Sequence, residues 1–202
     1  MTGWIVVVPV RRFAAAKSRL EVPDREGVAR AVALDTLQVL TSVPAVRRVL
    51  VITDDPGERS WPDAMRAVQQ RRRGLSGAVA DGIAAARLLD PRGPVAVVLG
   101  DLPRITPTAV TALLAAAARV PVGFVRDAAG TGTTTVTIAP GVRFATAFGR
   151  DSAAHHRALG AVELTASVAL RHDLDTAADL ARAHGSSGPC LAALLEAHPP
   201  GR

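Results

Sequence analysis

Asp101 stands at a position where a carboxylate could hold a metal ion for chemistry on phosphates. It lies just after an apolar run at 94–98, which is too short for a helix and is bounded by glycines. Such a run predicts a strand buried on both faces, and open α/β sheets bind ligands where these strands end. Pro103 then fixes the exit of the chain. The alternative is that Asp101 only begins a turn, as most aspartates at strand ends do.

Asp173 and Asp175 form a second acidic feature farther along the chain. In an extended backbone, residues two apart point to the same side, so both carboxylates can face one pocket. Two like charges are unfavourable together unless a cation or a proton neutralises them. With Asp101 they would supply three hard oxygen ligands of the kind that Mg²⁺ prefers. The alternatives are solvated carboxylates, or a helix cap made by Asp175 and Thr176.

Lys17 is the only lysine among the 24 Lys and Arg residues of the chain. It lies with Arg11 and Arg19 in a loop after the first expected strand, where charges and N–H groups can converge on a triphosphate. Lysine offers phosphate a compact point charge that arginine does not imitate well, although its single occurrence is also compatible with chance. The loop has no glycine, so it matches neither the P-loop nor a dinucleotide motif.

Two further loops suit an anion. Residues 127–135 include two glycines and a run of threonines, so the backbone can approach an anion closely and donate N–H and O–H groups to it. Residues 148–152 lead into a short helix whose first N–H groups also suit phosphate or carboxylate. Each is an ordinary turn by itself. Together with the aspartates they predict a site for an anionic acceptor beside a metal-bound nucleotide.

Apolar strand-like runs alternate with longer stretches of helical period, which predicts an α/β fold with helices packed on a mostly parallel sheet. We interpret His155 and His156 as residues of a helix surface and Cys190 as a buried structural thiol. Ser76, Thr106 and Thr176 are the expected helix caps. We expect strands at 4–10, 49–53, 95–99, 122–125 and 133–138, and helices at 25–43, 76–89, 152–159, 190–197, from 107 and from 177.

The composition limits the class of protein. A length of 202 residues fits one domain, 1–202, whose last residues from about 196 form a frayed tail. No apolar run has the length of a membrane span and no secretory signal begins the chain, so we expect a soluble cytoplasmic protein. The net charge is +6, but the basic residues are scattered, with one dense cluster at 71–73, and aromatic residues are few. This argues against a nucleic-acid partner.

The chain resembles the guanylyltransferases of deazaflavin coenzyme F-420 biosynthesis, which act on phosphoenolpyruvate or 2-phospho-L-lactate. The resemblance implies a single-domain, Rossmann-like fold of the nucleotide-diphospho-sugar-transferase type. Wider relatives carry a glycine-rich first loop, which this chain lacks. The matching motifs run in unbroken order from residue 4 to about 180: Val8-Pro9-Val10, Lys17-Ser18-Arg19-Leu20, Gly100-Asp101-Leu102-Pro103, Gly130-Thr131-Gly132-Thr133-Thr134, Phe148-Gly149 with Ser152 and His155, and Asp173-Leu174-Asp175-Thr176.

The resemblance implies a transfer of GMP from GTP to the phosphate of a small phospho-acid, with release of pyrophosphate. It implies Mg²⁺ as the cofactor and phosphoenolpyruvate as the favoured acceptor. The residues that it assigns are Asp101, Asp173 and Asp175 to the metal, Thr133, Gly149 and Ser152 to the acceptor, Arg11, Lys17, Arg19, Ser76 and Gly77 to the nucleotide, and Asp101 and Lys17 to catalysis.

Several alternatives stay open from the sequence. The acceptor could be 2-phospho-L-lactate or 3-phosphoglycerate, because no residue that we can name discriminates these acids from phosphoenolpyruvate. A sugar or molybdenum-cofactor nucleotidyltransferase would share the fold and the acidic set. A domain that binds nucleotide without turnover and a basic nucleic-acid-binding protein are the alternatives outside the enzymes.

Overall fold

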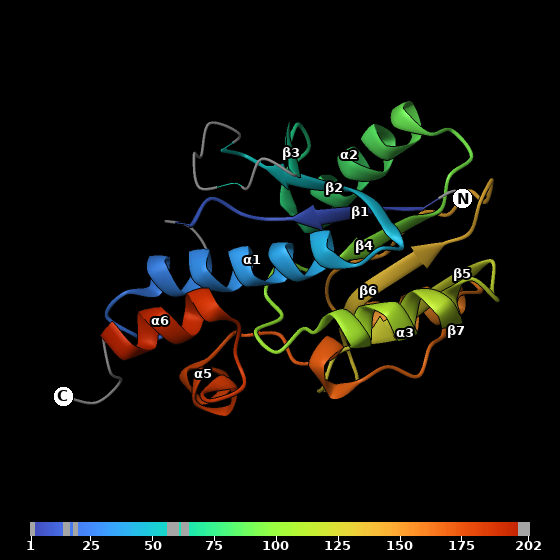
Figure 1. Cartoon of the computed structure of the whole chain (residues 1–202). Helices are drawn as coiled ribbons and strands as arrows, with labels where there is room; N and C mark the ends of the chain where they lie inside the picture. The colour runs from blue at the N-terminus through green and yellow to red at the C-terminus, as the bar shows by residue number, and fades with distance from the viewer. Residues whose placement is uncertain (1–2, 14–16, 18–19, 56–60, 62–64, 198–202) are drawn as a thin grey trace.

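A mixed β-sheet forms the centre of the molecule. The structure is a computed structural model, and it describes residues 3–13, 17, 20–55, 61 and 65–197. In the described part of the chain, seven strands are hydrogen-bonded in the order β3-β2-β1-β4-β6-β5-β7 (Figure 1). The strands are β1 Trp4–Pro9, β2 Val46–Thr53, β3 Met65–Gln69, β4 Val95–Val98, β5 Val122–Arg126, β6 Thr133–Ile138 and β7 Val162–Glu163.

In the parallel half of the sheet, β1 and β4 are the continuous apolar runs that predict doubly buried strands. β1 pairs in parallel with β2 and β4, and every residue of β4 is buried. β6 is the exception, because it runs antiparallel to both β4 and β5. The first residues of β6 therefore lie beside the carboxyl end of β4, where Leu99 N–H donates to the Thr134 carbonyl at 2.9 Å. This arrangement brings the threonine-rich segment next to Asp101.

Helices cover both faces of the sheet, as predicted. Alternate residues of β1 divide between the two cores, since Val6 and Val8 pack with helices α1 and α3 whereas Ile5 and Val7 pack with α2 and α4. No described helix has both the length and the apolar character needed to cross a membrane. The helices are α1 Arg25–Ser42, α2 Gly74–Leu89, α3 Pro107–Ala117, α4 Ser152–Ala158, α5 Ala177–Ala183 and α6 Pro189–Ala197, with a 3₁₀ turn, η2, at Val168–Leu170.

Two of the three expected helix caps are confirmed and one is wrong. The Thr106 hydroxyl accepts from Ala109 N–H at the start of α3, and Thr176 forms a reciprocal capping box with Asp179 at the start of α5. Helix α2 instead begins at Gly74, so Ser76 lies inside its first turn. Gly74 has a φ of +77°, which glycine adopts readily, and this lets the chain enter the helix two residues early.

A buried carboxylate attaches α6 to α1. Asp35, in the middle of α1, is only 2% exposed and accepts hydrogen bonds from Cys190 N–H at 2.8 Å and Leu191 N–H at 2.9 Å. It therefore satisfies the free amides at the start of a helix that is distant in the sequence, and its charge faces the positive end of that helix. Gly188 passes so close that an added Cβ would lie 2.4 Å from Asp35 Cγ.

Replacement of Asp35 by alanine should destabilise the protein strongly. The change leaves one buried and one partly buried N–H group without an acceptor, and such a loss costs about 2–3 kcal/mol. Urea denaturation would measure the free energy of unfolding of Asp35→Ala against the wild type. Asp24→Ala, which removes the exposed cap of α1, serves as the comparison and should cost only about 1 kcal/mol. Equal losses in the two variants would contradict the role given to Asp35.

Candidate active site

Three carboxylates meet at the carboxyl end of β4. One oxygen from each of Asp101, Asp173 and Asp175 lies within 4.8 Å of the others. The acidic pair reaches Asp101 because Leu174 N–H donates to the Asp101 carbonyl at 3.0 Å, while the Leu174 side chain is fully buried. The backbone of the pair is held in turn by Asp179, whose carboxylate accepts from Asp175 N–H at 3.1 Å. The spacing of the aspartates thus brings them together as expected, and the capping role belongs to Thr176.

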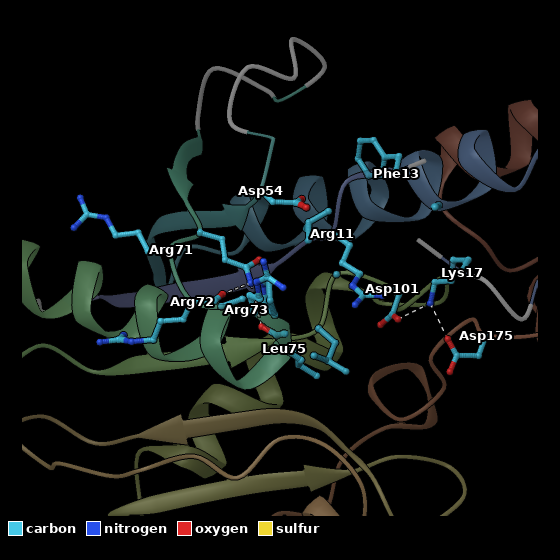
Figure 2. A pocket seen from close by; sticks show the side chains of 18 residues that line it. Arg11, Phe13, Lys17, Asp54, Arg71, Arg72, Arg73, Leu75, Asp101 and Asp175 are labelled. Carbon is cyan, nitrogen blue, oxygen red and sulfur yellow. Dashed lines mark hydrogen bonds and ion pairs between the residues drawn. The ribbon is translucent and has the colours of Figure 1, made fainter. Parts of the chain in front are cut away.

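Lys17 is the counter-charge of this acidic cluster. Its Nζ donates to Asp101 Oδ2 at 2.5 Å and to Asp175 Oδ1 at 3.0 Å (Figure 2). Burial by itself would lower the pKa of Lys17, but the charges of the two carboxylates outweigh it and raise the pKa above its ordinary value. The backbone of Lys17 has a φ of +54°, in the left-handed region that a lysine rarely adopts. The lysine is therefore charged and held in place by strong interactions.

One ammonium does not balance three carboxylates. The pKa of Asp173 is raised to about 6 by burial and then by the neighbouring charges of Asp101 and Asp175. Asp101 Oδ1 is buried and accepts no hydrogen bond from any described residue. An orphaned oxygen within a set of hard donors fits a divalent cation of the Mg²⁺ or Mn²⁺ type. The three aspartates could therefore hold a metal ion.

A cleft of about 720 Å³ opens beside the carboxylates, a volume within the range of small-molecule sites. In Figure 2, Asp101, Lys17 and Asp175 stand on one side of it, the Arg71–Arg73 loop stands on the other, and Arg11 lies between them. Its lining is Pro9, Val10, Arg11, Phe13, Lys17, Ala29, Asp54, Gln70, Arg71, Arg72, Arg73, Gly74, Leu75, Ala78, Leu99, Gly100, Asp101 and Asp175.

The basic loop at Arg71–Arg73 is a part of the site that the sequence did not reveal. Asp81 of α2 accepts from the N–H groups of Arg71 at 2.7 Å and Arg72 at 2.8 Å, and also pairs with the Arg72 guanidinium. Burial would raise the pKa of Asp81, but these hydrogen bonds outweigh it and lower the pKa. The run of three arginines was the available signal. Its place on the cleft depends on the contact with Asp81, which no local pattern shows.

Ser76 and Gly77 lie behind this loop and do not line the cleft. An added Cβ on Gly77 would lie 2.7–2.8 Å from atoms of Arg72, so the glycine lets the basic loop pack on α2. The Ser76 hydroxyl donates to the Phe148 carbonyl at 2.7 Å, which ties α2 to the turn before α4. Arg19 lies outside the described residues.

The residues assigned to the acceptor gather around the start of α4. Thr133 and Ser152 are buried, and Gly149 is exposed with a φ of +132° that favours glycine. Ala153 N–H donates to the Thr131 carbonyl at 3.0 Å, which joins the helix to the glycine-threonine loop. None of the three lines the 720 Å³ cleft. They form a second group, beside the carboxyl end of β4.

His156 is buried, so its interpretation as a surface residue is wrong, whereas His155 is exposed as predicted. The ring of His156 is fully buried and lies among Phe124, Phe144 and Phe148, with centroid distances of 6.0, 6.2 and 5.2 Å. Burial, followed by the charge of His155, lowers the pKa of His156 to about 4. Adjacent helical positions differ by about 100°, so one histidine faces the sheet while its neighbour faces solvent.

The neutral ring of His156 should make the protein less stable in acid. An unfolded histidine takes up a proton near pH 6.5, whereas folded His156 does so only at about 4. Between these values the unfolded state binds more protons. The contribution of His156 is therefore complete above about pH 6.5 and is lost as the pH falls to about 4, by on the order of 3 kcal/mol.

Urea titrations of the wild type and of His156→Asn at several pH values within this window would measure the effect. The free energy of unfolding of the wild type should fall more steeply toward low pH than that of the variant. Parallel profiles would contradict the burial of a neutral imidazole at this position.

No family model matches the sequence. Curated relatives cover almost all of the chain. It is 44% identical over 186 residues to a phosphoenolpyruvate guanylyltransferase of Streptomyces coelicolor, an alignment that covers 88% of each chain. It is also 44% identical over 204 residues, or 94% of each chain, to a phosphoenolpyruvate guanylyltransferase of Streptomyces scabiei.

Solved structures share the fold at low sequence identity. A protein described as a nucleotide-diphospho-sugar transferase from Desulfovibrio desulfuricans G20 superimposes with a TM-score of 0.70 at 18% identity, covering 97% of this chain and 95% of its own. A 4-diphosphocytidyl-2C-methyl-D-erythritol synthase gives 0.65 at 15%, covering 90% and 96%. Rv0371c of Mycobacterium tuberculosis in complex with manganese gives 0.60 at 18%, covering 90% and 97%. These likenesses confirm the predicted fold class.

Proposed function

The chain belongs to the phosphoenolpyruvate guanylyltransferase family, and we propose that it transfers GMP from GTP to the phosphate of phosphoenolpyruvate, with release of pyrophosphate. It is a nucleotidyltransferase. The site feature that supports the assignment best is a cluster of three carboxylates and Lys17, of which Lys17, Asp101 and Asp175 line a basic cleft. Such a site has the charges needed to bring two anionic substrates together.

The chemistry needs no activated side chain. An oxygen of the acceptor phosphate attacks the α-phosphorus of GTP, the bond between the α-phosphorus and its bridging oxygen breaks, and pyrophosphate leaves. The attacking phosphate is already ionised at neutral pH, so no general base is required. Catalysis then consists of positioning and of charge neutralisation. The cleft fits this demand, because its described lining contains arginines, a lysine and aspartates but no histidine, cysteine or serine.

We propose that Asp101, Asp173 and Asp175 hold Mg²⁺, which when bound neutralises phosphate charge. The orphaned Asp101 oxygen and the choice of hard donors support this assignment, and the fold neighbour Rv0371c was solved with manganese. Lys17, which shares Asp101 and Asp175, supplies a further positive charge at the same wall of the cleft.

The remaining residues divide between the two substrates. Arg11 and the basic loop face the cleft and would bind the nucleotide, together with Lys17 and with Arg19 of the first loop. Ser76 and Gly77 would act indirectly, because they hold the basic loop and the turn at Phe148. For the phospho-acid we propose Thr133, Gly149 and Ser152 around the start of α4. Their hydroxyl and amide groups are donors, as an anionic acceptor requires.

Pyrophosphate release tests the reaction. With Mg²⁺ and phosphoenolpyruvate, GTP should support faster release than ATP, CTP or UTP. With GTP, phosphoenolpyruvate should be a better acceptor than 2-phospho-L-lactate or 3-phosphoglycerate. A preference for CTP, or for a sugar phosphate, would replace the proposed reaction by another nucleotidyl transfer on the same fold.

Asp101→Asn is the matched loss-of-function variant in this assay. The neutral amide keeps the shape but removes the charge that faces Lys17 and the proposed metal, so turnover should be lost while the thermal midpoint stays close to that of the wild type. Asp55→Asn, which lies just after β2 and does not line the cleft, should leave the rate unchanged. Near-normal turnover by Asp101→Asn would remove this residue from the mechanism.

Arginines of the basic loop should control the Michaelis constant for GTP. Arg72 is spared because its guanidinium pairs with Asp81 and holds the loop. In the double variant Arg71→Gln/Arg73→Gln, the KM for GTP should rise about tenfold or more, since a hydrogen bond to a charged group contributes about 1.5–3 kcal/mol. The KM for phosphoenolpyruvate should stay the same. Arg119→Gln, exposed beyond α3, is the control, and an equal rise in both KM values would contradict a role confined to the nucleotide.

A further inference from the structure

A single side chain joins the three segments that carry the proposed acceptor residues. His156 Nδ1 lies 3.0 Å from the hydroxyl of Thr133 at the start of β6. Its Nε2 lies 2.9 Å from the amide nitrogen of Ala147, two residues before Gly149. The ring belongs to α4, whose first residue is Ser152. The proposed reaction uses none of the atoms of this histidine directly.

The two contacts determine where the proton of the ring lies. A backbone amide can only donate, so Nε2 of His156 must accept from Ala147 and carries no proton. A neutral imidazole then has its proton on Nδ1, which donates to the Thr133 hydroxyl oxygen. The ring is neutral at pH 7, because burial holds its pKa at about 4. The hydroxyl of Thr133 therefore accepts from His156 and has its own proton left to donate elsewhere.

A β-bulge turns Thr133 toward the histidine. Val125 of β5 pairs with Thr135 of β6, but the next residue, Arg126, pairs with Thr133, so β6 has one extra residue at this point. An extra residue shifts the alternation of side chains along a strand by one. Thr134 accordingly donates to the Leu170 carbonyl at 2.6 Å, in the core on the other face of the sheet, while Thr133 points to α4. Bulges commonly re-aim a side chain next to a site.

We propose that His156 is a positioning residue that makes the Thr133 hydroxyl a dedicated hydrogen-bond donor to the anionic acceptor. The proposal rests on the proposed function, since the phospho-acid would receive the proton of Thr133. Phosphate and carboxylate oxygens at neutral pH only accept, so a hydroxyl fixed as a donor matches them. Without the hydrogen bond from His156, the Thr133 hydroxyl could rotate and point its proton away from the acceptor.

Asparagine and leucine at position 156 form a matched pair for the test, because they have similar shapes and both lose the acceptor for Ala147 N–H. Only asparagine retains a donor for Thr133. In His156→Leu the KM for phosphoenolpyruvate should rise about 10- to 100-fold, the effect expected from one hydrogen bond to a charged group. In His156→Asn it should stay within about threefold of the wild type. The KM for GTP should not change in either variant.

Thr133→Val provides a double-variant cycle and His184→Gln, on an exposed helix end, provides the control. If His156 acts through Thr133, the double variant His156→Leu/Thr133→Val should be no worse for phosphoenolpyruvate than Thr133→Val alone. The proposal would be overturned if the effects of His156→Leu and Thr133→Val on the KM for phosphoenolpyruvate multiplied in the double variant. It would also be overturned by equal KM values in the leucine and asparagine variants, or by equal rises in the KM values for both substrates.

The tautomer is measured independently of turnover, on the wild-type protein. Two-dimensional ¹H–¹⁵N spectra of the histidine rings should show His156 as neutral and protonated at Nδ1 at pH 7. Protonation at Nε2 would overturn the proposal even if the variants do not fold. An absence of GTP-dependent pyrophosphate release by the wild type would instead contradict the proposed function, and the spectrum would still decide whether His156 donates to Thr133.

Discussion

The mutual repulsion of three carboxylates is the constraint on which the rest of the structure depends. Asp101, Asp173 and Asp175 are crowded within 4.8 Å, although like charges at such a separation oppose each other. The backbone prevents their separation, because Leu174 N–H is bonded to the Asp101 carbonyl and the Leu174 side chain is buried below. The free energy of folding gained in the rest of the molecule thus offsets the repulsion among the three carboxylates. A cation is then the natural partner of the site, and Lys17 already provides one.

The antiparallel course of β6 explains how the proposed acceptor residues come to lie at the same edge of the sheet as this cluster. In an all-parallel sheet the start of every strand would lie at the edge opposite Asp101. The reversed strand brings its first threonines to the same edge as the carboxyl ends of β1 and β4. The basic cleft and the proposed acceptor residues therefore belong to different elements of the fold but lie at the same edge of the sheet.

Features encoded in local sequence were predictable, and features created by packing were not. Continuous apolar runs identified β1 and β4, Thr106 and Pro107 identified the start of α3, and the spacing of the aspartates indicated that they could meet. The position of the basic loop depends on Asp81, ten residues from Arg71 in the sequence. The contact of Asp35 with α6 spans more than 150 residues. Neither has a local signal.

His156 shows a different limit. A polar residue type predicts an exposed position, but successive residues of a helix point about 100° apart, so neighbours can differ in burial. The same helix hides His156 against three phenylalanines and exposes its neighbour, and only the docking of α4 on the sheet decides between them.

The hydrogen bond from Ser76 to the Phe148 carbonyl links the segment that carries the basic loop to the segment that carries the proposed acceptor residues. Helix α2 begins directly after the arginine loop. Ser76, in the first turn of this helix, donates a hydrogen bond to the carbonyl of Phe148, one residue before Gly149. A displacement of α2 on one side is therefore felt on the other. If a ligand bound beside the basic loop favours one position of α2, it changes the affinity for a ligand bound beside Gly149. Thermodynamic reciprocity then requires that the second ligand changes the affinity for the first by the same factor. Cooperativity between the two occupants would need no domain closure, only this one shared contact.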